Sequence, residues 1–183
     1  ESVTEFGVRI GISTRGILLS KANKIRSYDI QLDEHVKYLF SIANNYKDVK
    51  YEVGDTRSIE IEQTDLLFID TDHNYSQLRA ELNRHHTKVN KYICFHDTHT
   101  YGIRSDDIVN DPGLMPAIME FMRDNPEWKV DYFTTKNNGF TVLKKEIATA
   151  IEPVVQIKKR ILVAIPTAKY IEVETFKSMF DLD

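Results

Sequence analysis

The chain has 183 residues, of which 42% are hydrophobic and 28% are charged, with 24 Lys and Arg against 28 Asp and Glu. This composition indicates one soluble globular domain with a sizeable core, and it leaves room for part of a second domain at the end. The net charge of −4 gives no electrostatic reason to expect nucleic acid or an anionic membrane as a partner.

The cysteine content and the absence of targeting signals bear on the cellular compartment. The single cysteine, Cys94, lies inside an apolar run, which excludes an internal disulfide framework and fits a reducing environment. No run of ~18 apolar residues is present, and the first residues lack a basic segment followed by an apolar one. We therefore expect a cytoplasmic protein without a membrane span.

Short apolar runs alternate with charged stretches of helical spacing. The apolar runs predict strands at residues 3–6, 25–29, 49–53, 65–70 and 92–96, and the stretches between them predict helices at 13–22, 34–46 and 75–89. This alternation is typical of an α/β protein with a Rossmann-like, doubly wound parallel sheet and helices on both faces. A helix over 115–123 follows, and then strands at 128–134 and 139–144, joined by Lys136-Asn137-Asn138-Gly139, predict a C-terminal antiparallel hairpin.

The first predicted strand runs into a loop with the sequence Glu5-Phe6-Gly7-Val8-Arg9-Ile10-Gly11, followed by a helix. Gly7 and Gly11 permit the sharp turn and the close backbone approach that a nucleotide cofactor needs. The loop has no lysine and no compact G-x-G-x-x-G, and Glu5 would repel a phosphate. A cationic, phosphate-free cofactor fits better, and an ordinary strand-to-helix turn is the alternative.

The Glu-x-Gly-x-x-x-Gly pattern resembles motif I of the class I methyltransferases that depend on S-adenosylmethionine (SAM). The resemblance implies a site for the amino acid half of SAM that includes Glu5, Gly7, Gly11 and Ser13. Asp29 ends the second strand, where it is placed to accept hydrogen bonds from ribose hydroxyls. Asp55 follows the third strand, where the resemblance implies the adenine. A solvated aspartate and an ordinary Gly-Asp turn are the alternatives at these two positions.

Two further apolar strands end in residue types that bind metals. Asp70, Asp72 and His73 follow the fourth strand, and His96 and Asp97 end the fifth. Neighbouring parallel strands end at one edge of the sheet, so we expect Asp70 and Asp97 within a few ångströms of each other, able to share Mg²⁺ or Mn²⁺. His96 favours Mn²⁺. His73 has the imidazole expected of a general base, and capping of the following helix is its alternative role.

The segments Ile-Asp-x-Asp-His-x-Tyr and Phe-His-Asp resemble the methyltransferase group related to cephalosporin hydroxylase and macrocin O-methyltransferase, over residues 1–145. The resemblance implies that Asp70 and His73 provide a metal ligand and the catalytic base, and that His96 and Asp97 complete the metal site. His96 stands where an acidic residue is expected, which leaves the metal requirement open. Asn90, where relatives often have Pro-Gly-Gly, tolerates a left-handed turn.

Two groups of polar residues carry less specific signals. Asp106, Asp107 and Asp111 lie in a segment with Pro and Gly that suits a lid over the acceptor or, alternatively, helix capping. His85 and His86 are adjacent on a predicted helix, so they point in different directions and are expected at the surface.

The end of the chain departs from the methyltransferase pattern. Residues 146–160 predict a linker, and residues 161–183 predict a new strand and helix that resemble the start of a family 2-like glycosyltransferase. On this interpretation the chain is a fragment of a larger protein. The alternative is a C-terminal extension that packs on the same domain or on a neighbour.

These observations predict a SAM-dependent O-methyltransferase, metal-assisted, that acts on a hydroxyl of a sugar, a glycan or another small molecule. Two alternatives stay open. One is a metal-dependent, hydroxylase-like enzyme of the same fold group, and the other is a catalytically inactive SAM-fold module in a larger glycan-modifying protein. The sequence does not determine the acceptor, the metal or the oligomeric state.

Overall fold

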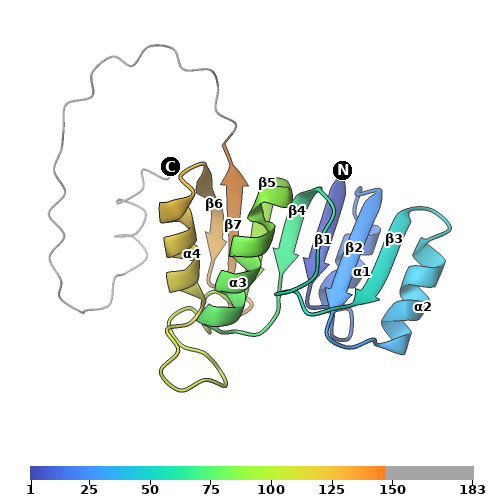
Figure 1. Ribbon diagram of the computed structural model, residues 1–183. Helices are drawn as coiled ribbons and strands as arrows, with labels where there is room; N and C mark the ends of the chain where they lie inside the picture. Colours follow the sequence, from blue (N-terminus) through green and yellow to red (C-terminus); the bar gives the residue numbers. More distant parts are fainter. Residues whose placement is uncertain (147–183) are drawn as a thin grey trace, which may run out of the picture. The chain divides into compact units, whose positions relative to one another are not determined.

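The computed structural model describes residues 1–146, so most of the predicted linker and the whole glycosyltransferase-like end lie outside the described residues. The elements follow one another as β1 (Ser2–Phe6), α1 (Ile12–Leu19), β2 (Lys24–Asp29), α2 (Glu34–Ala43), β3 (Asp48–Val53), β4 (Thr64–Ile69), α3 (Tyr75–His85), the 3-10 turn η1 (His86–Lys88), β5 (Val89–His96), α4 (Leu114–Asp124), β6 (Trp128–Thr134) and β7 (Phe140–Lys145) (Figure 1). Within residues 1–146, no helix is long and apolar enough to cross a membrane.

The seven strands form one sheet in the order β3-β2-β1-β4-β5-β7-β6. Strands β1 to β5 run parallel, β7 pairs antiparallel with β5, and β6 pairs antiparallel with β7. The predicted Rossmann-like sheet with a terminal hairpin is therefore confirmed. The loops that follow the parallel strands gather at one edge of the sheet. The pairing of His96 with Phe140 brings the β6–β7 turn to the same edge.

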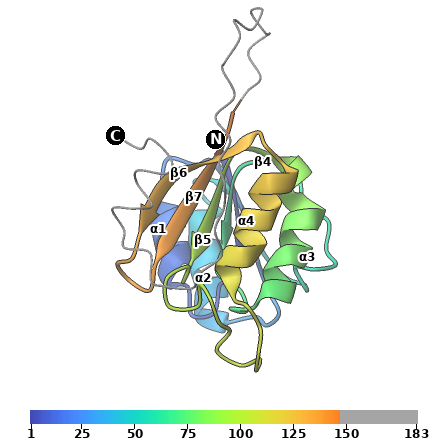
Figure 2. The ribbon, with the colours of Figure 1, turned by 90° about the vertical axis from the view of Figure 1, so that its left-hand side faces the viewer.

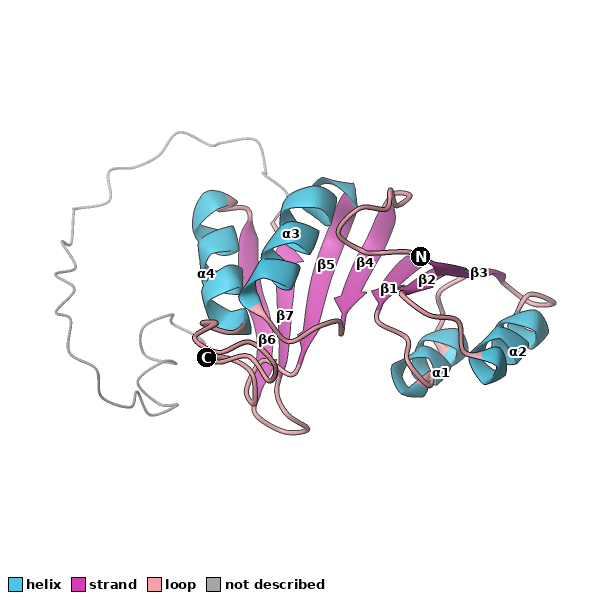
Figure 3. Ribbon diagram, turned by 60° about the horizontal axis from the view of Figure 1, so that its bottom comes forward, coloured by secondary structure: helices cyan, strands magenta, loops and turns pink. Residues whose placement is uncertain are grey.

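Helices cover both faces of the sheet, as predicted (Figure 3). On one face, α3 and α4 lie side by side (Figure 2) and bury Leu78, Leu82 and Phe121 in a cluster with Phe6 and Phe95 of the sheet. On the other face, a second cluster joins Val36 and Phe40 of α2 to Val8, Ala22, Ile25 and Val49, and Ile17 and Leu18 of α1 pack against it. Burial of apolar surface on both faces holds the sheet rigid beneath the loops at its carboxyl edge.

The predicted helix over 75–89 is too long. Helix α3 ends at His85, and Val89 already belongs to β5. His85 is only 1% exposed, and its Nε2 lies 2.6 Å from the backbone oxygen of Thr56, so the expected surface position is wrong. Asn90 lies within β5 rather than in a left-handed turn. The loop after β3 therefore holds the last ring of the helix.

Candidate functional site

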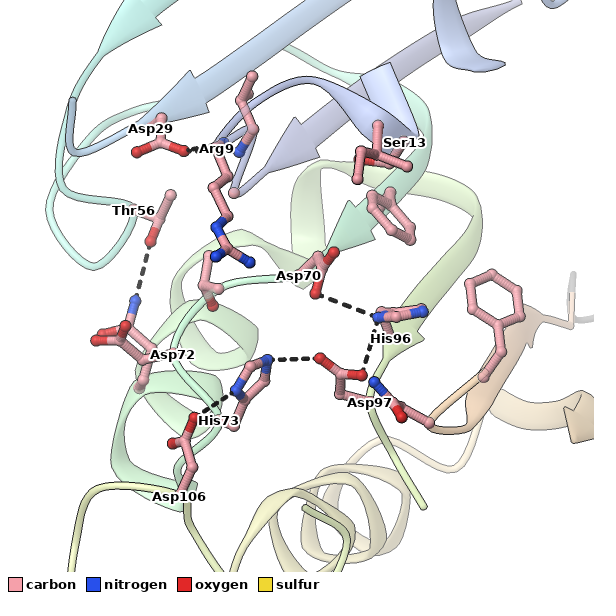
Figure 4. A pocket seen from close by; sticks show the side chains of 18 of the residues that line it. Arg9, Ser13, Asp29, Thr56, Asp70, Asp72, His73, His96, Asp97 and Asp106 are labelled. Atoms are coloured by element: carbon pink, nitrogen blue, oxygen red, sulfur yellow. Dashed lines mark hydrogen bonds and ion pairs between the residues drawn. The ribbon is translucent and has the colours of Figure 1, made fainter. Parts of the chain in front are cut away.

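A cavity of about 1030 Å³ opens at the edge of the sheet where the five parallel strands end (Figure 4). The loops after β1 to β5 and the β6–β7 turn form its wall. The predicted site residues that line it are Gly7, Ser13, Asp29, Asp55, Asp70, His73, His96 and Asp97. The lining also contains seven aspartates, which are Asp29, Asp55, Asp70, Asp72, Asp97, Asp106 and Asp107. A wall so rich in carboxylates attracts cationic ligands.

The glycine loop after β1 takes backbone angles that need glycine. Gly7 has φ of 83°, and a Cβ there would lie 1.9 Å from the backbone oxygen of Asp70. Gly11 has φ of 78°, and a Cβ there would lie 2.8 Å from the side chain of Val36. Gly11 is not among the residues that line the cavity, and its contact with Val36 lets helix α1 start against α2. Gly7 thus brings the β1–α1 loop close to the end of β4.

Glu5 lies behind this loop rather than in the cavity. It is fully buried and accepts hydrogen bonds from the hydroxyls of Ser13, Thr14 and Ser27, at 2.7 to 3.0 Å. Burial raises the pKa of Glu5, and the three hydroxyls oppose that shift. Glu5 thus fixes the start of α1 to β2. It also holds the side chain of Ser13, which lines the cavity.

Asp29 and Asp55 both line the cavity, but their carboxylates already have partners. Asp29 Oδ2 accepts the backbone N–H groups of Val8 and Arg9, each at 2.7 Å, so it holds the glycine loop in place. Asp55 pairs with the guanidinium of Arg57, with 2.8 Å between Oδ2 and Nη2, and these hydrogen bonds lower the pKa of Asp55. Each carboxylate keeps further lone pairs for a ligand hydroxyl or amine.

Asp70, His96 and Asp97 converge at the adjoining ends of β4 and β5, as predicted. One ligand atom from each residue lies within 4.8 Å of the others. His96 Nδ1 is 3.4 Å from Asp70 Oδ1 and 3.1 Å from Asp97 Oδ1. Asp97 has φ of 61°, a left-handed conformation that turns its carboxylate back toward Asp70 at some cost in backbone strain.

Two of these three ligand atoms are buried without a hydrogen bond. His96 Nδ1 and Asp97 Oδ1 have no hydrogen-bond partner within residues 1–146, despite the short distance between them. Buried polar atoms are costly unless they are satisfied, and such pairs in native proteins point to an ion or another ligand. Burial also raises the pKa of the Asp70 carboxyl. The donor set of two carboxylates and one imidazole fits Mn²⁺ or Mg²⁺.

His73 is held by two carboxylates. Its Nε2 lies 2.6 Å from Asp97 Oδ2, and its Nδ1 lies 2.9 Å from Asp106 Oδ2. The ring stacks on Tyr101 at 4.3 Å. Asn74, not His73, caps α3, by accepting the Gln77 N–H at 2.8 Å. Both ring nitrogens are occupied while these contacts last, so His73 orients Asp97 in this conformation and is not free to take a proton from an acceptor.

Sequence reasoning missed two residues of the site, Arg9 and Asn137, and did not foresee the contact of Asp106 with His73. Arg9 lies on the glycine loop and lines the cavity. Asn137 lies in the β6–β7 turn with its side-chain nitrogen 3.2 Å from His96 Nε2. Asp106 holds His73 and so does more than the lid or capping role expected of its segment. Asp111 does serve helix α3, where its carboxylate accepts the N–H of Tyr75. Of these residues, Arg9 alone could have been noticed in the sequence, because it lies between the two glycines of the loop.

A buried network joins two walls of the cavity. Glu81 of α3 is fully buried and accepts hydrogen bonds from Thr56 Oγ1, at 2.5 Å, Gln77 Nε2, at 2.8 Å, and Thr71 Oγ1, at 3.0 Å. Thr56 belongs to the loop after β3, and Thr71 directly follows Asp70. Burial raises the pKa of Glu81 to about 7. Glu81 therefore connects the loop beside Asp55 to the loop that carries Asp70.

Comparisons with known proteins identify the fold. No family model matches the sequence, and no curated protein matches it significantly. Among similar solved structures, a Corynebacterium glutamicum protein has a TM-score of 0.60 and 19% identity, over 81% of this chain and 74% of that chain. A Klebsiella pneumoniae protein, provisionally assigned as an O-methyltransferase, has a TM-score of 0.57 and 19% identity, over 80% and 73% of the two chains.

A third structure carries a ligand. The N-methyltransferase NodS from Bradyrhizobium japonicum WM9, in complex with S-adenosylhomocysteine (SAH), has a TM-score of 0.56 and 10% identity, over 79% of this chain and 78% of that chain. At these identities the comparison shows a common fold. The chain therefore has the Rossmann-like fold of the class I methyltransferases.

Proposed function

We propose that the protein is a SAM-dependent O-methyltransferase, with the acceptor hydroxyl held beside Asp70, His96 and Asp97. The observation that carries this proposal is the pair of buried ligand atoms without a hydrogen bond, His96 Nδ1 and Asp97 Oδ1, next to Asp70 in a cavity bordered by the glycine loop. Structures of the same fold include a methyltransferase in complex with SAH.

The cavity supports SAM as the cofactor on electrostatic grounds. Sulfonium and ammonium groups are cations, and seven aspartates line the wall. The loop that would meet a pyrophosphate in a dinucleotide-binding protein has no lysine. Ribose hydroxyls and an adenine amine would find acceptors at Asp29 and Asp55, which lie on the same side of the cavity as the glycine loop.

Asp70, His96 and Asp97 would hold a divalent cation, Mn²⁺ or Mg²⁺. The ion would supply a positive charge that lowers the pKa of an acceptor hydroxyl. Neighbouring residues of the chain orient the ligand atoms of this site before the ion binds. Asp106 and Asp97 hold the ring of His73, and His73 in turn holds Asp97 Oδ2 so that Oδ1 faces His96. The predicted role of His73 as the general base requires that Asp106 first release Nδ1.

Asp70 would serve as a ligand of the cation, so the proton of the acceptor hydroxyl would pass to His73 Nδ1 once Asp106 has released it. Alignment of the acceptor oxygen with the methyl group supplies most of the remaining rate. Phe68 of β4, Tyr132 of β6 and Phe140 of β7 also line the cavity. Their rings offer apolar surface to a sugar ring or another small acceptor, so we keep the small-molecule or glycan acceptor as part of the proposal.

The two alternative functions have less support. A hydroxylase-like centre with two histidines would need a second imidazole at the cluster, and in the described part of the chain the cluster holds only His96. An inactive module has no need to keep strained and unpartnered groups at the cavity, yet Asp97 and His96 are such groups. Metal-assisted methyl transfer accounts for both.

Calorimetry on the full chain tests the proposal. SAH is titrated into chelator-treated protein, and Mn²⁺ is titrated in a second experiment, for wild type, Asp70→Asn and Asp72→Asn. We expect saturable SAH binding in all three and Mn²⁺ binding that weakens at least about tenfold in Asp70→Asn alone. Asp72→Asn is the matched control, because Asp72 is an exposed neighbour outside the cluster. Folded wild type that binds no SAH, or an equal loss of Mn²⁺ in both variants, would contradict the proposal.

A further inference from the structure

Arg9 occupies a backbone conformation that is unfavourable for its residue type. Its φ is 50°, between Gly7 at 83° and Gly11 at 78°. Glycine adopts such angles freely, whereas a residue with a Cβ does so at a cost. Asp29 enforces the conformation, because its Oδ2 accepts the N–H of Arg9 at 2.7 Å. A residue retained in a strained backbone conformation beside a cavity is a reason to look for a ligand of its side chain.

The guanidinium of Arg9 is available for such a ligand. Figure 4 shows the side chain reaching from the glycine loop into the cavity, toward the wall that carries Asp70 and Asp72. Arg57 also lines the cavity but is neutralised by Asp55. Within residues 1–146, Arg9 makes no ion pair or side-chain hydrogen bond, and the same holds for the side chain of Lys136.

The negative charge of the cavity wall indicates which group of a ligand the guanidinium of Arg9 would bind. Seven aspartates line the wall and would repel any ligand that carries a carboxylate. An amino acid group has both an ammonium, which this wall attracts, and a carboxylate, which it repels. A guanidinium binds a carboxylate with two parallel hydrogen bonds. Lys136 lies in the β6–β7 turn, beyond β4 and β5 from the glycine loop, and so serves the other end of the cavity.

We propose that Arg9 binds the carboxylate of the amino acid group of the cofactor. The inference rests on the proposed function, since it takes SAM to be the ligand of this cavity. It adds a specific contact: the cofactor is recognised through its carboxylate by a side chain of the glycine loop, and not only through its nucleoside. The strained backbone of Arg9 then has a function, because it directs the guanidinium toward the cofactor.

The test compares SAH with 5′-methylthioadenosine, which has the same nucleoside and thioether but no amino acid group. Calorimetric affinities for both are measured on the full chain for wild type, Arg9→Gly and Lys136→Gln. Arg9→Gly removes the guanidinium and relieves the backbone strain, so the variant should fold at least as well as wild type, which a melting curve checks. Lys136→Gln removes the other unpaired cation of the cavity wall.

We expect Arg9→Gly to weaken SAH about tenfold or more, as for loss of a hydrogen-bonded charge pair, and to change the affinity for 5′-methylthioadenosine by less than about twofold. Lys136→Gln should change neither. Equal effects of Arg9→Gly on both ligands, or no effect on either, would overturn the role of Arg9 while SAM binding stands. Wild type that binds neither ligand would overturn the proposed function and this inference with it.

Discussion

The buried carboxyl of Glu81 leads to a quantitative prediction about stability and pH. Burial raises its pKa from 4.5 to about 7 in the folded protein. The fold therefore favours the protonated form over the charged one. The shift corresponds to about 3 kcal/mol, at about 1.4 kcal/mol per pKa unit.

The sign follows from the raised pKa. The stabilisation is fully present below about pH 4.5, where Glu81 is protonated in both the folded and the unfolded chain. It is lost as the pH rises, by about 1.4 kcal/mol per unit, and the loss levels off above about pH 7. The variant Glu81→Gln keeps the shape and accepts the bonds from Thr56 and Gln77 with its amide oxygen, while its amide nitrogen donates to Thr71.

Urea unfolding of wild type and Glu81→Gln, followed by circular dichroism from about pH 4.5 to about pH 8, measures the effect. The free energy of unfolding of wild type should fall relative to the variant by about 3 kcal/mol over this range. The difference between the two proteins cancels the titration of all other groups. A difference that stays constant with pH would refute the assignment of a raised pKa to Glu81.

Three further predictions concern the loop, the core and the metal cluster. Gly7→Ala should lower the free energy of unfolding by more than about 2 kcal/mol, because φ is 83° and the new Cβ would lie 1.9 Å from a backbone oxygen. Gly16→Ala, where a Cβ has nothing within 4 Å, should raise the free energy of unfolding by up to about 1 kcal/mol, and urea unfolding compares the two variants. Cys94 is buried and its pKa is raised to about 12, so a thiol reagent should label it only after unfolding, and labelling at the rate of a free thiol in native buffer would contradict its burial. Asn137→Gly should weaken Mn²⁺ about tenfold in calorimetry, because the amide holds the ring of His96, and an unchanged affinity would exclude this role.

The mostly parallel sheet with its terminal hairpin and the approach of Asp70 to Asp97 followed from local patterns. Each apolar run ends in a polar residue at the edge of the sheet, so the position of Asp70 after one strand and of Asp97 after the next implied their approach. Neighbouring parallel strands require it, and the pairing of Ile69 with Phe95 provides it. The approach of Asp70 to Asp97 could therefore be predicted from the sequence alone.

The remaining features depend on contacts between distant segments. The ring of His85, at the end of helix α3, is buried against the backbone oxygen of Thr56, 29 residues away in the chain. Asp106 reaches His73 across 33 residues. Residue types alone do not show which distant partner a polar side chain will choose. Glu5 illustrates the same limit, since the three hydroxyls that turn it away from the cavity come from two different elements.

A crystal structure of the full chain with SAH and Mn²⁺, with anomalous diffraction to locate the manganese, tests the central claim most directly. The account predicts an anomalous peak within bonding distance of Asp70, His96 and Asp97, with SAH in the same cavity against the glycine loop. Manganese bound at another place, or SAH outside this cavity, would contradict the account.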